Sequence, residues 1–186
     1  MIVCGLSAFG QKKKPVSKPA ATAKNMLAKA DDLSAEVIQK KNGAVFYALT
    51  GKDTLFSSPI PKDGVPTQVK ITPFTAGAAK LYGISWTQKK KLGDPKSKLE
   101  NITESHTEIW DITAKKRVFE NTNSVNNITE IVWLDPNKTA SKTVEKVRRE
   151  GMECSLMPTG DVILKSKSQE TKYCYDPAGQ KFVNKK

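Results

Sequence analysis

The only histidine of the chain, His106, lies between two glutamates at a spacing suited to acid–base chemistry. In an extended strand the side chains of Glu104, His106 and Glu108 share one face, together with Trp110. Hydrolases use carboxyl pairs about 5–9.5 Å apart, or a histidine beside a carboxylate. A hydrolase that uses His106 with Glu104 or Glu108 is therefore one hypothesis. A solvated strand face is the simpler explanation of the same pattern.

Other catalytic and cofactor motifs are missing from the sequence. It contains no Gly-x-Ser-x-Gly nucleophile motif, no glycine-rich dinucleotide motif and no P-loop. Its three cysteines and one histidine include no Cys-x-x-Cys pair. We therefore predict no metal site and no cofactor, and the sequence favours a protein without enzymatic activity.

Aromatic side chains at alternate strand positions form a candidate ligand or partner face. Such residues line binding grooves in some sheets, and in others they form the inner, packed face. Packing is the more common of the two outcomes. The candidate face consists of Tyr82, Trp86, His106, Trp110 and Trp133.

Two cysteines near the C-terminus predict a disulfide. If the first ten residues are removed on export, Cys154 and Cys174 remain as an even pair. Both fall in predicted strands of one C-terminal sheet, where cross-strand proximity would permit a bond. Two buried free thiols are the alternative.

The N-terminus resembles the end of a secretory leader. Residues 1–10 are apolar and end in Ala-Phe-Gly, and residues 11–22 are basic and proline-containing. We interpret 1–10 as a signal-peptide remnant and 11–22 as a flexible tether. A lipid anchor on Cys4 and a short buried strand are the alternatives for the first segment. No apolar run reaches the length of about 20 residues that a membrane-spanning helix needs.

The charge of the chain permits a polyanion-binding alternative. The formal net charge is +12, but of 31 basic residues only Arg117, Arg148 and Arg149 are arginine. Specific phosphate and base recognition relies on the bidentate arginine fork, whereas scattered lysines more often solubilise a surface. Nucleic-acid binding by an intracellular, cytoplasmic protein is therefore an alternative that the sequence does not favour.

The sequence predicts an α+β fold in a single domain from residue 23 to residue 186. An apolar stripe with a period of 3.6 residues predicts a long helix over 23–41, and a shorter helix is expected at 141–150. A largely antiparallel sheet of about eight to eleven strands would pack against them. Both helices precede a glycine and a hairpin, which suggests a duplicated helix-hairpin unit or a chance similarity.

These patterns together favour an exported, non-enzymatic protein of the cell envelope. It would reside in the periplasm, at the outer membrane or on the cell surface. It would bind another protein or an envelope component through a sheet face or an exposed edge strand. The sequence does not identify the partner or the oligomeric state.

Overall fold

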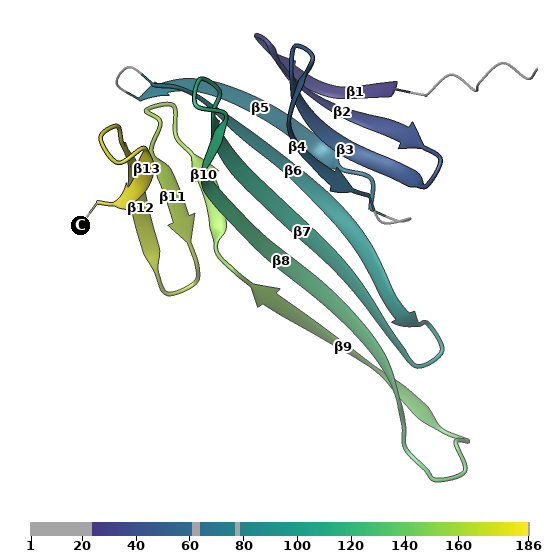
Figure 1. The fold of residues 1–186 in the computed structure, drawn as a ribbon. Coiled ribbons are helices and arrows are strands. Elements are labelled where there is room, and N and C mark those ends of the chain that lie inside the picture. Colours follow the sequence, from purple (N-terminus) through teal and green to yellow (C-terminus); the bar gives the residue numbers. More distant parts are fainter. Residues whose placement is uncertain (1–23, 61–63, 77–78, 186) are drawn as a thin grey trace, which may run out of the picture.

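The computed structural model describes residues 24–60, 64–76 and 79–185, and every regular element in them is a β-strand (Figure 1). Thirteen strands form three antiparallel sheets. The described part of the chain has no helix long and apolar enough to span a membrane. The predicted leader and tether, 1–10 and 11–22, lie outside the described residues. The α+β prediction is wrong, and the fold is all-β.

The first sheet, called here the N-sheet, is built from consecutive hairpins. Its strand order follows the sequence. Tight turns connect its strands, at Asp31–Asp32, Lys41–Asn42 and Gly51–Lys52. The strands are β1 (Lys24–Ala30), β2 (Leu33–Lys40), β3 (Gly43–Thr50) and β4 (Asp53–Pro59).

The long helix predicted over 23–41 is wrong, because this segment forms the β1–β2 hairpin. Asp31 adopts a left-handed conformation with φ of 49°, which reverses the chain. After the turn, Leu33 and Ala35 are buried on one face of β2 at a period of two. The apolar spacing of the segment fits both periods, and the β-branched Val37 and Ile38 favour the strand.

The central sheet contains the longest strands of the protein. Its strands also pair in sequence order, and β8 continues without a break through a stretch rich in asparagine. They are β5 (Thr67–Ala76), β6 (Ala79–Asp94), β7 (Lys98–Asp111), β8 (Lys116–Trp133) and β9 (Ser141–Glu150).

The helix predicted at 141–150 is also wrong. This segment is β9, which pairs with β8 from Ser141 opposite Trp133 to Glu150 opposite Ser124. Nine of its ten residues are exposed, so it has no apolar face that could dock a helix. Without either helix, the duplicated helix-hairpin unit is wrong as well.

The third sheet, the C-sheet, consists of four short strands near the C-terminus. Gly151 lets the chain leave β9, because its φ of +77° disfavours a side chain and a Cβ at this position would lie only 2.6 Å from the Thr122 carbonyl oxygen. The strands are β10 (Glu153–Leu156), β11 (Val162–Lys165), β12 (Glu170–Asp176) and β13 (Lys181–Asn184).

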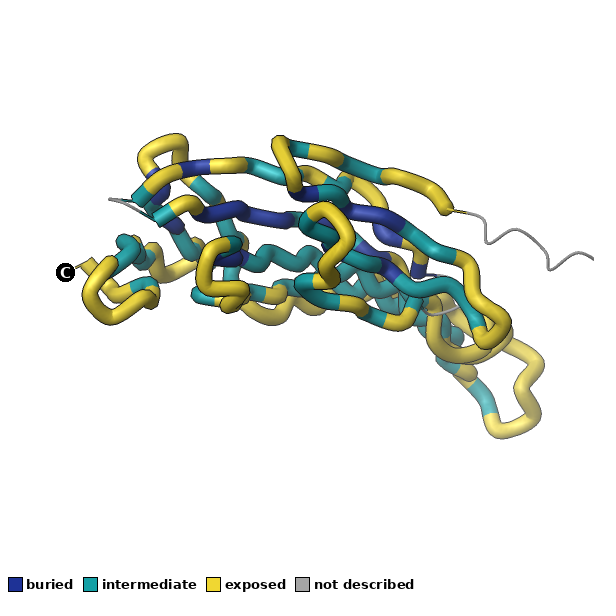
Figure 2. The backbone as a smooth tube through the Cα atoms, turned by 45° about the horizontal axis from the view of Figure 1, so that its top comes forward, coloured by how far each residue is buried: buried dark blue, intermediate teal, exposed yellow. Residues whose placement is uncertain are grey.

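The N-sheet and the C-sheet pack on opposite faces of the central sheet. Tyr82 and Trp86 on β6 contact the N-sheet core, whereas Leu81 on the same strand contacts the C-sheet core. Neighbouring residues of a strand point to opposite faces, so the protein has three layers. We call the two sides of the central sheet face N and face C. Figure 2 shows buried segments concentrated where the layers overlap.

Part of the central sheet extends beyond both covering sheets. The far ends of β6 to β9 project to the lower right of Figure 1, away from the N-sheet and the C-sheet. Large apolar residues are exposed in this region, among them Leu92 at 54%, Trp133 at 44% and Val147 at 61%. We call this region the uncovered half of the central sheet.

Candidate functional site

Four of the five predicted face residues meet on face N. Tyr82 lies opposite Trp110, and Trp86 lies opposite His106, in the register between β6 and β7. Tyr82, Trp86 and Trp110 are only 2%, 6% and 8% exposed, because the N-sheet covers them. Tyr82 also donates a 2.8 Å hydrogen bond to Asp31 in the β1–β2 turn. These aromatic residues hold the N-sheet on the central sheet.

An aromatic cluster continues across the interface between the two sheets. Phe46 and Phe56 of the N-sheet lie 5.2 Å and 5.5 Å from the Trp86 ring. Phe56 also stacks on Trp110 with centroids 5.9 Å apart, and His106 stacks on Trp86 at 5.0 Å. Each stacked or tilted aromatic pair at these distances stabilises the fold by about 0.5–1.5 kcal/mol, in addition to the stabilisation from burying the apolar surface of the rings.

The His106 imidazole is half-buried at the margin of this cluster. Its Nδ1 lies 3.1 Å from the Thr122 hydroxyl, and its Nε2 lies 3.5 Å from the Glu104 carboxylate. Burial lowers the pKa of His106, and the neighbouring Glu104 opposes that shift only in part. Glu104 itself forms a 2.6 Å ion pair with Lys90. A neutral histidine that packs on tryptophan fits this geometry.

Glu108 is engaged in a separate network. One of its carboxylate oxygens accepts a 2.8 Å hydrogen bond from Trp110 Nε1, and the other accepts a 3.0 Å hydrogen bond from Arg117. Arg117 also contacts Glu120 at 2.6 Å. Both oxygens of Glu108 therefore have structural partners, as expected for a carboxylate that positions its neighbours.

Trp133, the fifth predicted face residue, lies apart from the other four. It is the last residue of β8, opposite Ser141, on the uncovered half of the sheet. The predicted aromatic face therefore divides into a buried cluster on face N and one exposed tryptophan.

The predicted disulfide between Cys154 and Cys174 is wrong, because both cysteines are free. Cys154 lies on β10 and Cys174 on β12, with β11 between them. Two strand spacings amount to about 9.6 Å, whereas bridged cysteines need Cα atoms within about 7 Å. The register also places them on opposite faces of the C-sheet. Burial raises the pKa of Cys154, and a hydrogen bond to Asp161 is the main cause of the raised pKa of Cys174.

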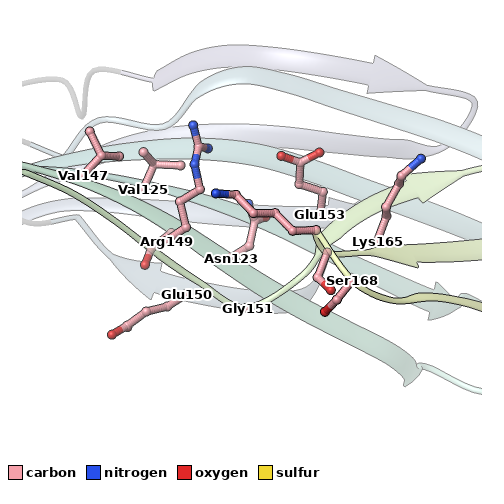
Figure 3. Close-up of a pocket in the computed structure, with 12 residues that line it drawn as sticks. Asn123, Val125, Val147, Arg149, Glu150, Gly151, Glu153, Lys165 and Ser168 are labelled. Carbon is pink, nitrogen blue, oxygen red and sulfur yellow. The ribbon is translucent and has the colours of Figure 1, made fainter.

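A cleft opens on face C where the uncovered half meets the C-sheet (Figure 3). Its volume is about 680 Å³, which lies in the usual range for ligand sites. Val125 of β8 and Val147 and Arg149 of β9 contribute to its floor. The turn between β11 and β12, with Lys167 and Ser168, forms the opposite wall.

The cleft combines apolar surface with charges of both signs. Val125 and Val147 are the apolar part, and Arg149 and Glu153 form no ion pair within the described residues. None of the residues that line the cleft is aromatic. The cleft therefore offers hydrogen bonds and charge complementarity, without a stacking platform for bases.

The sequence pattern does not predict the cleft, because it assigns Val147 and Arg149 to a helix. The β-branched residues Thr143, Val144 and Val147 are the signal that could have identified the strand. Within the described ranges, no group of three or more His, Cys, Asp or Glu residues could hold a metal ion. Comparison with protein-family models, with curated proteins and with solved structures found no match to the chain.

Proposed function

We propose that the chain is a non-enzymatic binding module of an exported cell-envelope protein, and that a polypeptide segment of a partner binds in the face C cleft. The observation that carries this proposal is the open cleft beside the uncovered half of the sheet. The crosslinking experiment described below would also reveal an envelope component other than a protein, if such a component occupies the cleft.

The chemistry of the cleft favours a polypeptide. Apolar side chains of a partner would contact Val125 and Val147, while Arg149 and Glu153 would meet its charges or backbone groups. A polyanion finds less support, because the carboxylate of Glu153 lines the cleft together with the basic residues. The absence of aromatic lining residues also disfavours single-stranded nucleic acid, which stacks its bases on such side chains.

The predicted face on the other side of the sheet supports a structural role. Trp86 and Trp110 are buried against the N-sheet, and Glu104 and Glu108 are occupied by Lys90 and Arg117. Neither of the two cavities described for this chain is lined by His106, Glu104 or Glu108. The hydrolase hypothesis therefore gains no support from the surroundings of His106.

The experiment that tests the proposal is site-specific photo-crosslinking in cells that make the protein. A photo-reactive residue at the exposed position Ser168 lies in the cleft wall, and one at the exposed Ala178 lies at the other end of the C-sheet as a matched control. We expect one discrete polypeptide adduct in the envelope fraction from Ser168 and none from Ala178. Equal adducts at both positions, or none at either, would overturn the cleft as the binding site.

The compartment is tested on the same cells by the intact mass of the chain. We expect a mass that lacks residues 1–10, with both Cys154 and Cys174 open to alkylation. A full-length chain in the cytosolic fraction would refute export. Nucleic acid bound there with a steep salt dependence would instead support the polyanion alternative.

A further inference from the structure

Strand β9 is an edge of the central sheet. It pairs with β8 alone among the described strands, and its other side presents unpaired backbone N–H and C=O groups (Figure 1). Nine of its ten residues are exposed. Proteins either protect such an edge or pair it with another strand, so the side chains of β9 indicate which applies here.

On face N the charges of β9 from Lys146 to Glu150 are already paired within the chain. Lys146 lies 3.5 Å from Glu130 on β8, and Arg148 lies 2.5 Å from Glu150. These four side chains share a face, because the register places Lys146 opposite Ile128 and Arg148 opposite Asn126. Between Lys146 and Glu150, face N of this edge is therefore nearly neutral.

On face C the charges of β9 have no ion-pair partner within the described residues. Glu145, Val147 and Arg149 alternate along this face, with a carboxylate and a guanidinium placed symmetrically about the valine. Val147 is 61% exposed. This edge carries a negative charge on one side of an exposed apolar residue and a positive charge on the other side. Such an edge is complementary to a second copy of itself that runs in the opposite direction.

We infer that β9 pairs in antiparallel orientation with β9 of a second copy of this chain, about a two-fold axis at Val147. Val147 then lies opposite Val147 of the partner subunit. Glu145 lies opposite Arg149 of the partner subunit, and the symmetry repeats this ion pair on the other side of the axis. The two central sheets join into one continuous sheet, and the dimer goes beyond the binding role proposed for the cleft.

The register follows from side-chain direction and charge. A two-fold axis perpendicular to the sheet keeps face C of both copies on one side, so residues on one face can only oppose residues on the same face. Moving the axis to Lys146 or Arg148 places identical positive charges opposite each other and leaves Glu145 and Arg149 unmatched. At Val147 the axis brings Lys146 near Arg148 of the partner subunit, but Glu130 and Glu150 already neutralise these cations.

The dimer would also change the cleft. Arg149 lines the cleft of its own chain (Figure 3), and Glu145 of the partner subunit would lie beside it. Each copy would thus supply one carboxylate to the cleft of the other. The two clefts would open on the same side of the joined sheet, because the axis preserves the faces.

The test is sedimentation velocity of the full chain over a range of concentrations. We expect a monomer–dimer equilibrium in the wild type and a rise of about tenfold in its dissociation constant for Glu145→Arg or Arg149→Glu, since each replaces two opposite-charge contacts by two like-charge contacts. The double variant Glu145→Arg/Arg149→Glu keeps the net charge and should restore the wild-type equilibrium. Lys142→Glu, outside the paired segment, is the control.

The outcomes that overturn the dimer are specific. They are a wild type that stays monomeric at every concentration, or a dimer that neither single swap weakens. Failure of the double swap to restore the dimer would also count against this register. Circular dichroism of each variant establishes that the exposed substitutions leave the fold intact. The crosslink from Ser168 is read separately, so loss of the dimer and loss of cleft binding are distinguishable.

Discussion

The covered and uncovered halves of the central sheet are built from the same strands but hold their side chains in different ways. In the covered half of β7, the consecutive residues Ile109 and Trp110 are both buried, one under each covering sheet. In the uncovered half of the same strand, Leu99 and Glu100 are both partly exposed. One strand thus belongs to two cores at one end and to none at the other.

This difference separates two sources of stability. Burial of aromatic and aliphatic side chains stabilises the covered half. In the uncovered half, cross-strand contacts such as Asn126 with Glu100 and Lys146 with Glu130 take that role. Exposed ion pairs contribute about 0–1 kcal/mol each, so the uncovered half should be the more easily opened part of the sheet.

The largest effect is expected from removing a tryptophan in the covered half. Trp86→Ala should lower the free energy of unfolding by about 3–5 kcal/mol, because the ring packs among Phe46, Phe56 and His106. Trp133→Ala, in the uncovered half, should cost less than about 1 kcal/mol. Urea denaturation followed by circular dichroism measures both. Equal losses would erase the distinction between the two halves.

A smaller effect is expected from removing a carboxylate. Glu108→Ala leaves the buried Trp110 N–H without its acceptor and removes one of the two carboxylates that Arg117 contacts, so it should cost about 1–3 kcal/mol. Glu130→Ala removes an exposed contact to Lys146 and should cost about 1 kcal/mol or less. The cost of Glu130→Ala should shrink further in high salt, whereas that of Glu108→Ala should change little. The reverse pattern would contradict the assignment of the two networks.

The smallest effect is a pH dependence at the margin of the covered half. Burial lowers the pKa of His106 in the folded protein, so the unfolded chain takes up the proton first as pH falls. The stabilisation is complete above about pH 6.5 and is lost as pH falls through the folded pKa. Between about pH 7.5 and about pH 5.5, the wild type should lose more stability than His106→Gln. Equal losses in both proteins would show that His106 does not contribute.

Two carboxyl groups with a lowered pKa, Asp135 and Glu100, do not obscure this measurement. Asp135 accepts hydrogen bonds from Thr139 and Ala140, which lower its pKa, and hydrogen bonds from Lys98 and Asn126 lower that of Glu100. Both groups therefore titrate below the window in which His106 changes charge. Their loss of charge belongs to acid unfolding at lower pH.

The strands of the covered half could be predicted from the sequence, and their partners could not. Alternation of Tyr82, Ile84 and Trp86 with small residues correctly predicts a strand with one aromatic face. That this face packs beneath β2 and β3, some forty residues earlier in the chain, depends on long-range contacts. The same limit explains why the predicted disulfide is wrong. A sequence pattern can place a cysteine in a strand, but it does not show which strands lie next to each other or which face of the sheet the cysteine occupies.

The two predicted helices show where local patterns are ambiguous. The spacing of Leu33 and Val37 fits a helix and a strand, and the turn at Asp31 decides between them. Ser141 to Glu150 has no apolar face for either structure, and its strand conformation follows from pairing with β8. Tertiary pairing outweighs the local preference in such a segment.

Local patterns in the sequence correctly indicate the antiparallel, hairpin-rich character of the chain and the alternating aromatic positions of β6 and β7, and they contain no familiar catalytic motif. These features follow from local chemistry, since turn residues and side-chain alternation act over a few positions. Long-range packing, in contrast, places Tyr82, Trp86 and Trp110 in a core, keeps the two cysteines apart and leaves β9 as an edge beside a cleft. Each of these depends on which distant strands cover a face, and short-range periodicity carries no information about that.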